Sequence, residues 1–143
     1  MISFLNLSYK IGQELLFDEI SLSVFPSSIV KITGRNGAGK TTFLRILAGI
    51  IPINHGKIIS NITTVTYIGH NNGIKDDLTV IEYLEFWAKV FSNEMLILTV
   101  IHYLKLSNDL EKYCYSLSSG NKQKLSLARL MLSGSQIWII DEV

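Results

Sequence analysis

The sequence is poor in the residues that define several common protein classes. Its 143 residues include one cysteine and two prolines, and charged residues make up 17% of the chain, with a formal net charge of +1. The lone cysteine, Cys114, cannot form an internal disulfide, which argues against a small disulfide-stabilised secreted domain. So small a net charge gives no electrostatic reason to expect binding to nucleic acid or to an anionic membrane surface.

Long apolar segments and sorting signals are also lacking. The longest apolar stretch, near Met95–Leu104, is shorter than the roughly 20 residues that a membrane-spanning helix needs. Residues 1–10 have no basic segment followed by a long apolar run and a small-residue cleavage site, so we expect no signal peptide. No repeat, low-complexity tract or linker divides the chain, and we expect residues 1–143 to form a single domain.

The N-terminal part has the alternation of apolar and polar residues that is typical of strands. Residues 2–9, 14–17 and 20–25 alternate in this way and are separated by the turn-prone sequences KIGQ and DE. Pro26 ends the run because proline lacks a backbone donor. The β-branched segment 28–33 predicts one more short strand, directly before a glycine-rich stretch.

That stretch, GRNGAGKTT, fits the pattern G-x-x-x-x-G-K-[ST] between a predicted strand and a predicted helix. A chance match of its four specified positions is expected in roughly 1 in 200 chains of this length, given the usual glycine frequency. The pattern therefore predicts a phosphate-binding loop. We expect nine residues to bind the phosphates of a nucleotide: Gly34, Arg35, Asn36, Gly37, Ala38, Gly39, Lys40, Thr41 and Thr42.

The chemistry of phosphate binding accounts for this spacing. Glycines allow the backbone to turn tightly and to point N–H groups at phosphate oxygens. The helix that begins near Lys40 adds its partial positive charge. Lys40 is long enough to reach the β- and γ-phosphates, and the Thr41 hydroxyl is a candidate ligand of Mg²⁺. Four apolar residues of that helix are candidates for the core: Phe43, Leu44, Ile46 and Leu47.

A phosphate loop alone is compatible with kinases, GTPases and transport ATPases. The sequence LSSGN at residues 117–121, followed by a helical pattern, resembles the LSGGQ signature of ATP-binding cassette (ABC) ATPases. That resemblance implies that Ser118 and Gly120 act on the γ-phosphate of an ATP held by a partner subunit. The alternative is a Ser/Gly loop that caps a helix. Asn121 replaces the final signature glutamine and Ser119 a glycine.

The final residues, QIWIIDEV, resemble the Walker B strand of the same family, which we expect to be buried. The resemblance implies that Asp141 holds Mg²⁺ through water and that Glu142 is the general base that polarises the attacking water. It also implies an α/β P-loop NTPase fold with an ABC-type core, an N-terminal antiparallel β subdomain and a helical insert at 71–116. ATP is the nucleotide that the family implies.

The segment 67–87, YIGHNNGIKDDLTVIEYLEFW, lies where the family has its Q-loop and helical subdomain. It is similar to the ATP-binding subunit of the haem exporter of bacterial cytochrome c maturation. His70 stands at the glutamine position, and only neutral imidazole could replace the glutamine oxygen there. The alternative is a loop histidine without a ligand role. Apolar residues at helical spacing between 79 and 106 predict amphipathic helices that could contact a membrane partner.

The resemblance implies partners and a location as well. We expect a homodimer with a second copy of the ATPase, integral membrane permease subunits as further partners, and a peripheral position on the cytoplasmic face of a bacterial inner membrane. We expect no nucleic-acid partner. Ile11 stands near where the family has an aromatic residue that stacks on adenine. Tyr9 is a nearby candidate, with packing between strands as its alternative role.

The family continues beyond Glu142 with a further strand and a switch histidine, which these 143 residues do not include. We therefore expect an ABC domain that is incomplete at its C-terminus. A missing strand would leave sheet edges unpaired, so we expect this chain alone to be a poor ATPase. Other functions stay open: a noncatalytic nucleotide-binding remnant, an ABC transporter ATPase for another substrate, and a soluble ABC ATPase in repair, translation or iron–sulfur assembly.

Overall fold

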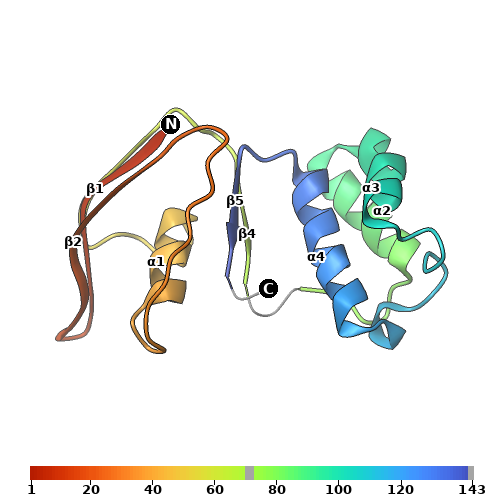
Figure 1. Cartoon of the computed structure of the whole chain (residues 1–143), viewed down its shortest axis with the longest axis horizontal. Helices are drawn as coiled ribbons and strands as arrows, with labels where there is room; N and C mark the ends of the chain where they lie inside the picture. Colours follow the sequence, from red (N-terminus) through yellow and green to blue (C-terminus); the bar gives the residue numbers. More distant parts are fainter. Residues whose placement is uncertain (70–72, 142–143) are drawn as a thin grey trace. The chain divides into compact units, whose positions relative to one another are not determined.

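The computed structural model describes residues 1–69 and 73–141, which form two compact units, Met1–Tyr67 and Ile68–Val143 (Figure 1). Each unit has its own set of packed side chains. The first is built mainly of strands and the second mainly of helices. The expectation that the whole chain is one domain stays a prediction.

A three-stranded antiparallel sheet forms most of the first unit. It consists of β1 (Ile2–Ile11), β2 (Glu14–Val24) and β3 (His55–Ser60) in the order β2-β1-β3. β1 lies in the centre and is paired on both sides. Its apolar residues Phe4 and Leu7 are buried, whereas Leu5 between them is 40% exposed. The antiparallel β subdomain expected at the N-terminus is confirmed.

The two strands expected at 14–17 and 20–25 are a single strand, β2. The intervening residues Asp18 and Glu19 form an irregularity within it instead of a turn. Glu19 has a φ of 48°, and its backbone N–H donates to the Ser8 hydroxyl at 2.9 Å. That hydroxyl donates in turn to the Asp18 carboxylate at 2.6 Å. Because these side chains satisfy the local backbone, pairing with β1 continues on both sides of the irregularity.

Segment 28–33 does not form the strand that its β-branched residues predicted. Its backbone has no sheet partner among the described residues, and Ile29 is 98% exposed. A strand is stabilised by hydrogen bonds and packing from neighbouring strands, which local sequence preference does not supply. The structure thus corrects this prediction.

Helix α1 (Lys40–Leu47) follows the glycine-rich loop. Phe43 and Ile46 are buried, as expected, whereas Leu44 and Leu47 are only partly buried. The Phe43 ring packs edge-on against Phe17 of β2, with ring centroids 5.3 Å apart. This contact attaches the helix, and the loop before it, to the sheet.

A second sheet consists of β4 (Val65–Ile68) and β5 (Ile137–Ile140). The N–H of Asp141, just after β5, donates to the carbonyl of Ile68 at 2.8 Å. The structure corrects the expectation that β5 is wholly buried. Ile139 is buried, but Trp138 is 49% and Ile140 44% exposed. Successive side chains of a strand point to opposite faces, and only one face of β5 is covered by the described residues.

Helices α2 (Val80–Phe91), α3 (Ile97–Leu104) and α4 (Ser119–Ser133) pack together in the second unit, with the short 3₁₀ turns η1 (Glu94–Leu96) and η2 (Cys114–Ser116) (Figure 1). The amphipathic helices expected between 79 and 106 are thus present. Within the described part of the chain, no helix is long and apolar enough to cross a membrane. The core residues are Val80, Tyr83, Leu84, Ala88, Val100, Ile101, Leu106, Cys114, Leu117, Leu125, Ala128 and Leu132.

Candidate nucleotide-binding site

The phosphate loop is an exposed turn at the N-terminus of α1. Gly39 is the N-cap of the helix, with no side-chain cap, and the first turn contains no acidic residue. The first N–H groups of a helix have no partner within it and can be satisfied by a capping side chain, by water or by a ligand. A helix start of this kind, after a turn of glycines, is the arrangement that receives an anion.

Lys40 lies within the loop instead of extending away from it. Its Nζ donates to the carbonyl oxygens of Gly34 at 3.0 Å and Arg35 at 2.9 Å. The Ala38 N–H donates to the Arg35 carbonyl at 3.2 Å, which closes a turn beneath the ammonium group. The ammonium is therefore held where the loop curves, and this position fits a phosphate ligand.

Two of the loop glycines are required by backbone geometry. Gly37 and Gly39 have φ values of 81° and 83°, which side-chain-bearing residues rarely adopt. A Cβ on Gly39 would also lie 2.5 Å from Cγ of Leu16 on β2, closer than atoms can approach. The sheet therefore comes against the loop at Gly39, and this contact was not foreseen from the sequence.

Tyr9, the candidate for adenine stacking, packs between strands. It lies opposite Phe17 in the β1–β2 pairing, and the two rings stack with centroids 6.0 Å apart. Phe17 continues the cluster to Phe43 of α1. This geometry favours the packing role, the alternative stated for Tyr9.

The signature residues lie at the start of α4. Ser118 is the N-cap, and its hydroxyl oxygen accepts the N–H of Asn121 at 3.3 Å. The hydroxyl hydrogen can still be donated to another oxygen, so capping and anion binding are compatible. Ser118, Ser119 and Gly120 are all exposed, and a Cβ on Gly120 would meet no atom within 4 Å among the described residues beyond its own helical turn. The chain's own packing thus gives no reason for a glycine at position 120.

Asn121 points to a neighbouring loop of the same unit. Its Nδ2 donates to Oδ2 of Asp109 at 2.9 Å, and the other Asp109 oxygen accepts from Lys112 at 2.7 Å. The next residue, Lys122, forms an ion pair with Asp76 at 3.3 Å. Neither carboxylate was predicted from the sequence to take part in the site. Asp109 precedes Asn121 by twelve residues, and no local pattern indicates that the two meet.

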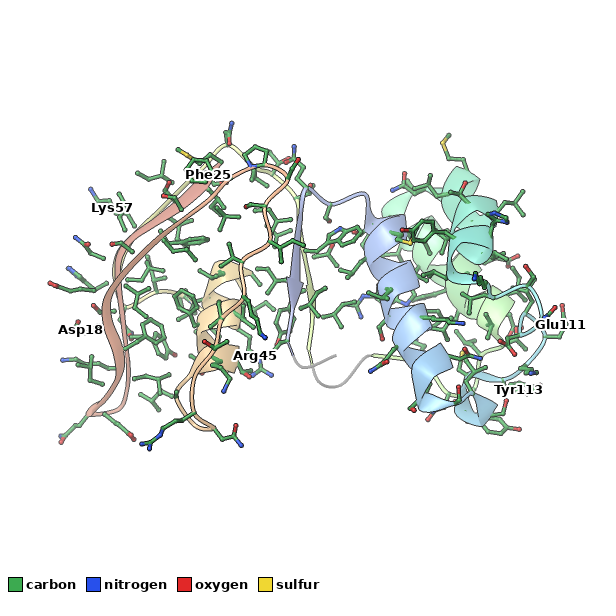
Figure 2. All side chains as sticks on the ribbon, in the orientation of Figure 1. Asp18, Phe25, Arg45, Lys57, Glu111 and Tyr113 are labelled. Atoms are coloured by element: carbon green, nitrogen blue, oxygen red, sulfur yellow. The ribbon has the colours of Figure 1, made fainter. Side chains whose placement is uncertain are left out.

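The segment that follows the Q-loop position is bound to the segment that leads into the signature. The Val80 N–H donates to the Lys112 carbonyl at 3.0 Å, and the Cys114 N–H donates to the Leu78 carbonyl at 2.8 Å. Thr79 and Tyr113 form an isolated antiparallel bridge at the same place. Residues 78–80 and 112–114 thus form one fixed element of the second unit, and Tyr113 is labelled on it in Figure 2.

Asp141 follows the last residue of β5 and is 5% exposed. Oxygen ligands of this kind suit Mg²⁺, which binds through one or two carboxylates or hydroxyls together with nucleotide phosphates. The residues predicted for that ion are Asp141 in the second unit and Thr41 in the first. His70 and Glu142, the other predicted catalytic residues, lie outside the described residues.

Comparison with known proteins identifies the family. A family model described as ABC transporter matches residues 17–143. The chain belongs to the ABC transporter family. It is 42% identical over 151 aligned positions to a protein of Rickettsia bellii named cytochrome c biogenesis ATP-binding export protein CcmA, an alignment that covers all of this chain and 77% of that protein. The protein of the same name in Wolbachia pipientis wMel is 40% identical, with 96% of this chain and 72% of that protein covered.

Solved structures agree on the fold. A putative ABC transporter ATP-binding protein from Pyrococcus furiosus matches 99% of this chain and 74% of its own, with a TM-score of 0.86 and 22% identity. An ATP-binding subunit of an ABC transporter matches with a TM-score of 0.85 and 22% identity, covering 98% of this chain and 65% of its own. The α/β P-loop fold of an ABC-type ATPase is therefore confirmed, and by family this ABC chain is an ATP-binding subunit with ATPase activity.

Proposed function

We propose that this chain binds and hydrolyses ATP as the nucleotide-binding subunit of an ABC exporter of haem for c-type cytochrome biogenesis. The observation that carries the proposal is the 42% identity, along the whole chain, to a protein named for ATP-dependent export in cytochrome c biogenesis. The position of Lys40 within the glycine-rich loop supports the nucleotide chemistry.

The proposed roles follow from the chemistry of each side chain. Backbone N–H groups of 34–42 and the Lys40 ammonium would bind the phosphates. The Thr41 hydroxyl would ligate Mg²⁺, and Asp141 would hold the ion through water. When bound, the ion neutralises charge on the β- and γ-phosphates. Glu142 is the proposed general base, and His70 replaces the Q-loop glutamine.

Two copies of the chain are proposed to act together. Ser118 and Gly120 at the start of α4 contact the γ-phosphate of the ATP held by the other copy. The exposure of these residues, and the open space around Gly120, support that role. The pair binds integral membrane permease subunits and lies peripherally on the cytoplasmic face of a bacterial inner membrane.

The nucleotide proposal is tested by titrating the purified chain with MgATP. Lys40→Ala removes charge-assisted hydrogen bonds to phosphate, so we expect its affinity to fall roughly 10- to 100-fold. The control is Lys57→Ala, which removes an exposed lysine from β3 (Figure 2) and is expected to bind like the unaltered chain. Equal affinity of Lys40→Ala and the unaltered chain would refute the assigned phosphate site. Binding without any turnover would support the noncatalytic alternative.

The export proposal needs a separate test in cells. A bacterium that lacks its own cytochrome c biogenesis ATP-binding export protein is supplied with the gene that encodes this chain, and c-type cytochromes are measured by their haem-dependent peroxidase stain. We expect haem attachment to return with the unaltered gene and to be absent when the gene carries Lys40→Ala. If MgATP binding is normal but c-type cytochromes do not return, the nucleotide-binding proposal stands and the proposed export of haem is wrong.

A further inference from the structure

The first turn of α4 has an exposed stretch followed directly by an anchored residue. Ser118, Ser119 and Gly120 are exposed, whereas Asn121 is partly buried and its amide donates to Asp109. If this turn only ended a loop, Asn121 could be as exposed as residues 118–120. Because Asn121 is instead held by Asp109, we infer that this bond sets the orientation of residues 118–120.

Asp109 is held in place by contacts other than its bond to Asn121. The residue is only 9% exposed. Its backbone N–H donates to the Leu106 carbonyl at 2.9 Å, and the Lys112 N–H donates to the Asp109 carbonyl at 3.0 Å. These two hydrogen bonds hold the 106–112 turn. The carboxylate that leaves this turn therefore has a defined direction, and the Asn121 amide is bound to a rigid acceptor.

The charges of the cluster suit an anion at the exposed part of the turn. The first turn of α4 contains no acidic residue, although an acidic residue there would stabilise the helix start. The Asp109 carboxylate, which binds Asn121, also forms an ion pair with Lys112, whose Nζ lies 2.7 Å from Asp109 Oδ1. The Lys112 charge therefore balances the charge of the carboxylate. Asn121 is a neutral donor. The turn is thus anchored without an unbalanced negative charge that would repel a phosphate.

We propose that Asp109 is a positioning residue for ATP held by a second copy of this chain. Through Asn121 it fixes the first turn of α4, so that Ser118, Gly120 and their N–H groups face the γ-phosphate. Asn121 therefore serves the signature by anchoring it and does not contact the nucleotide. This inference rests on the proposed function, in which the signature acts on the partner copy's ATP.

The test measures two equilibria on the purified chain. One is binding of magnesium adenylyl imidodiphosphate, a nonhydrolysable ATP analogue, to the phosphate loop. The other is association of two copies in the presence of that analogue, followed by analytical ultracentrifugation. The variants are Asp109→Ala, Asn121→Ala, the double variant and the conservative Asp109→Asn. The control is Glu111→Gln, which alters an exposed carboxylate of the same loop (Figure 2).

We expect Asp109→Ala and Asn121→Ala each to weaken analogue-dependent association about tenfold, the loss that one hydrogen bond to a charged group brings. Because both remove the same contact, the double variant should be no weaker than either single variant. Asp109→Asn keeps an acceptor oxygen and should associate within about threefold of the unaltered chain, as should Glu111→Gln. Binding to the phosphate loop should stay unchanged in all of them.

The outcomes separate this inference from the proposed function. If Asn121→Ala associates as well as the unaltered chain, or if the double variant loses the product of the two single losses, Asp109 does not act through Asn121 and the inference is wrong. Asn121→Ala keeps a helix-favouring residue, so a folding defect in Asp109→Ala cannot obscure this result. If the unaltered chain binds the analogue but does not associate, the proposed action in trans fails and the inference falls with it.

Discussion

The two helix starts that carry the nucleotide motifs are fixed in different ways. The α1 start is fixed by its backbone: Gly37 and Gly39 adopt positive φ, Leu16 lies against Gly39, and the helix has no side-chain cap. The α4 start is fixed by side chains, with Ser118 as its N-cap and Asn121 bound to Asp109. The same kind of substitution should therefore act differently at the two helix starts.

The largest effect on folding is expected from Gly39→Ala. A Cβ there meets a φ of 83° and Leu16 at 2.5 Å, so we expect a loss of about 2–4 kcal/mol in the local free energy of unfolding. Hydrogen exchange of the α1 amides measures that loss. MgATP affinity should fall by at least about tenfold, since the loop N–H groups turn away from the phosphates. Unchanged exchange and affinity would show that the backbone does not fix this helix start.

Raising the pH above 10 should destabilise the second unit through ionisation of Tyr83. Burial raises the pKa of Tyr83 from 10.0 to about 12, with the Arg129 guanidinium acting in the opposite direction. The unfolded chain loses this proton first, so stability is present below about pH 10 and is lost as the pH rises toward 12. Between pH 8 and 11 the unaltered chain should lose about 1.4 kcal/mol more than Tyr83→Phe.

Urea unfolding followed by circular dichroism at the two pH values measures this difference. Tyr103→Phe, which alters an exposed tyrosine of α3, should behave like the unaltered chain. If Tyr83→Phe loses as much stability as the unaltered chain, the buried phenol does not contribute to the alkaline loss.

A smaller effect is expected at the start of α2, which is capped by side chains as α4 is. The Thr79 hydroxyl accepts the Glu82 N–H, and the Glu82 carboxylate accepts the Thr79 N–H at 2.8 Å. The bonds that the Thr79 N–H and hydroxyl donate to the ionised carboxylate lower the pKa of Glu82. Thr79→Ala should cost about 1 kcal/mol in the free energy of unfolding. Thr99→Ala, at an exposed position of α3, should cost less than about 0.5 kcal/mol. If urea unfolding gives the same loss of stability for Thr79→Ala and Thr99→Ala, the Thr79 cap does not stabilise α2.

The smallest effect on folding is expected from Gly120→Ala, although the chemical change is the same as in Gly39→Ala. Among the described residues outside its own helical turn, no atom lies within 4 Å of the added methyl group, and alanine favours the helix, so stability should rise by up to about 1 kcal/mol. Analogue-dependent association should nevertheless fall, because the methyl group occupies space next to the partner's phosphate. Unimpaired association would argue against a nucleotide contact at Gly120.

Local signals accounted for the helix starts. The glycine spacing at 34–39 correctly placed α1 at Lys40, and the LSSGN sequence placed α4. Signals failed where the outcome depends on distant residues. Segment 28–33 has strand-forming residues and no strand partner among the described residues. The Asp109–Asn121 bond joins residues from different elements, and the sequence carries no mark of it.

Local sequence is enough to specify the family and the positions of the nucleotide motifs, because glycine conformations, helix caps and apolar periodicity are properties of a few consecutive residues. Packing of the folded chain places Leu16 against Gly39 and the Lys40 ammonium on the loop carbonyls. It also anchors the signature turn on Asp109. These contacts join side chains and backbone groups that only packing brings within hydrogen-bond or van der Waals distance, so no local pattern of residues specifies them.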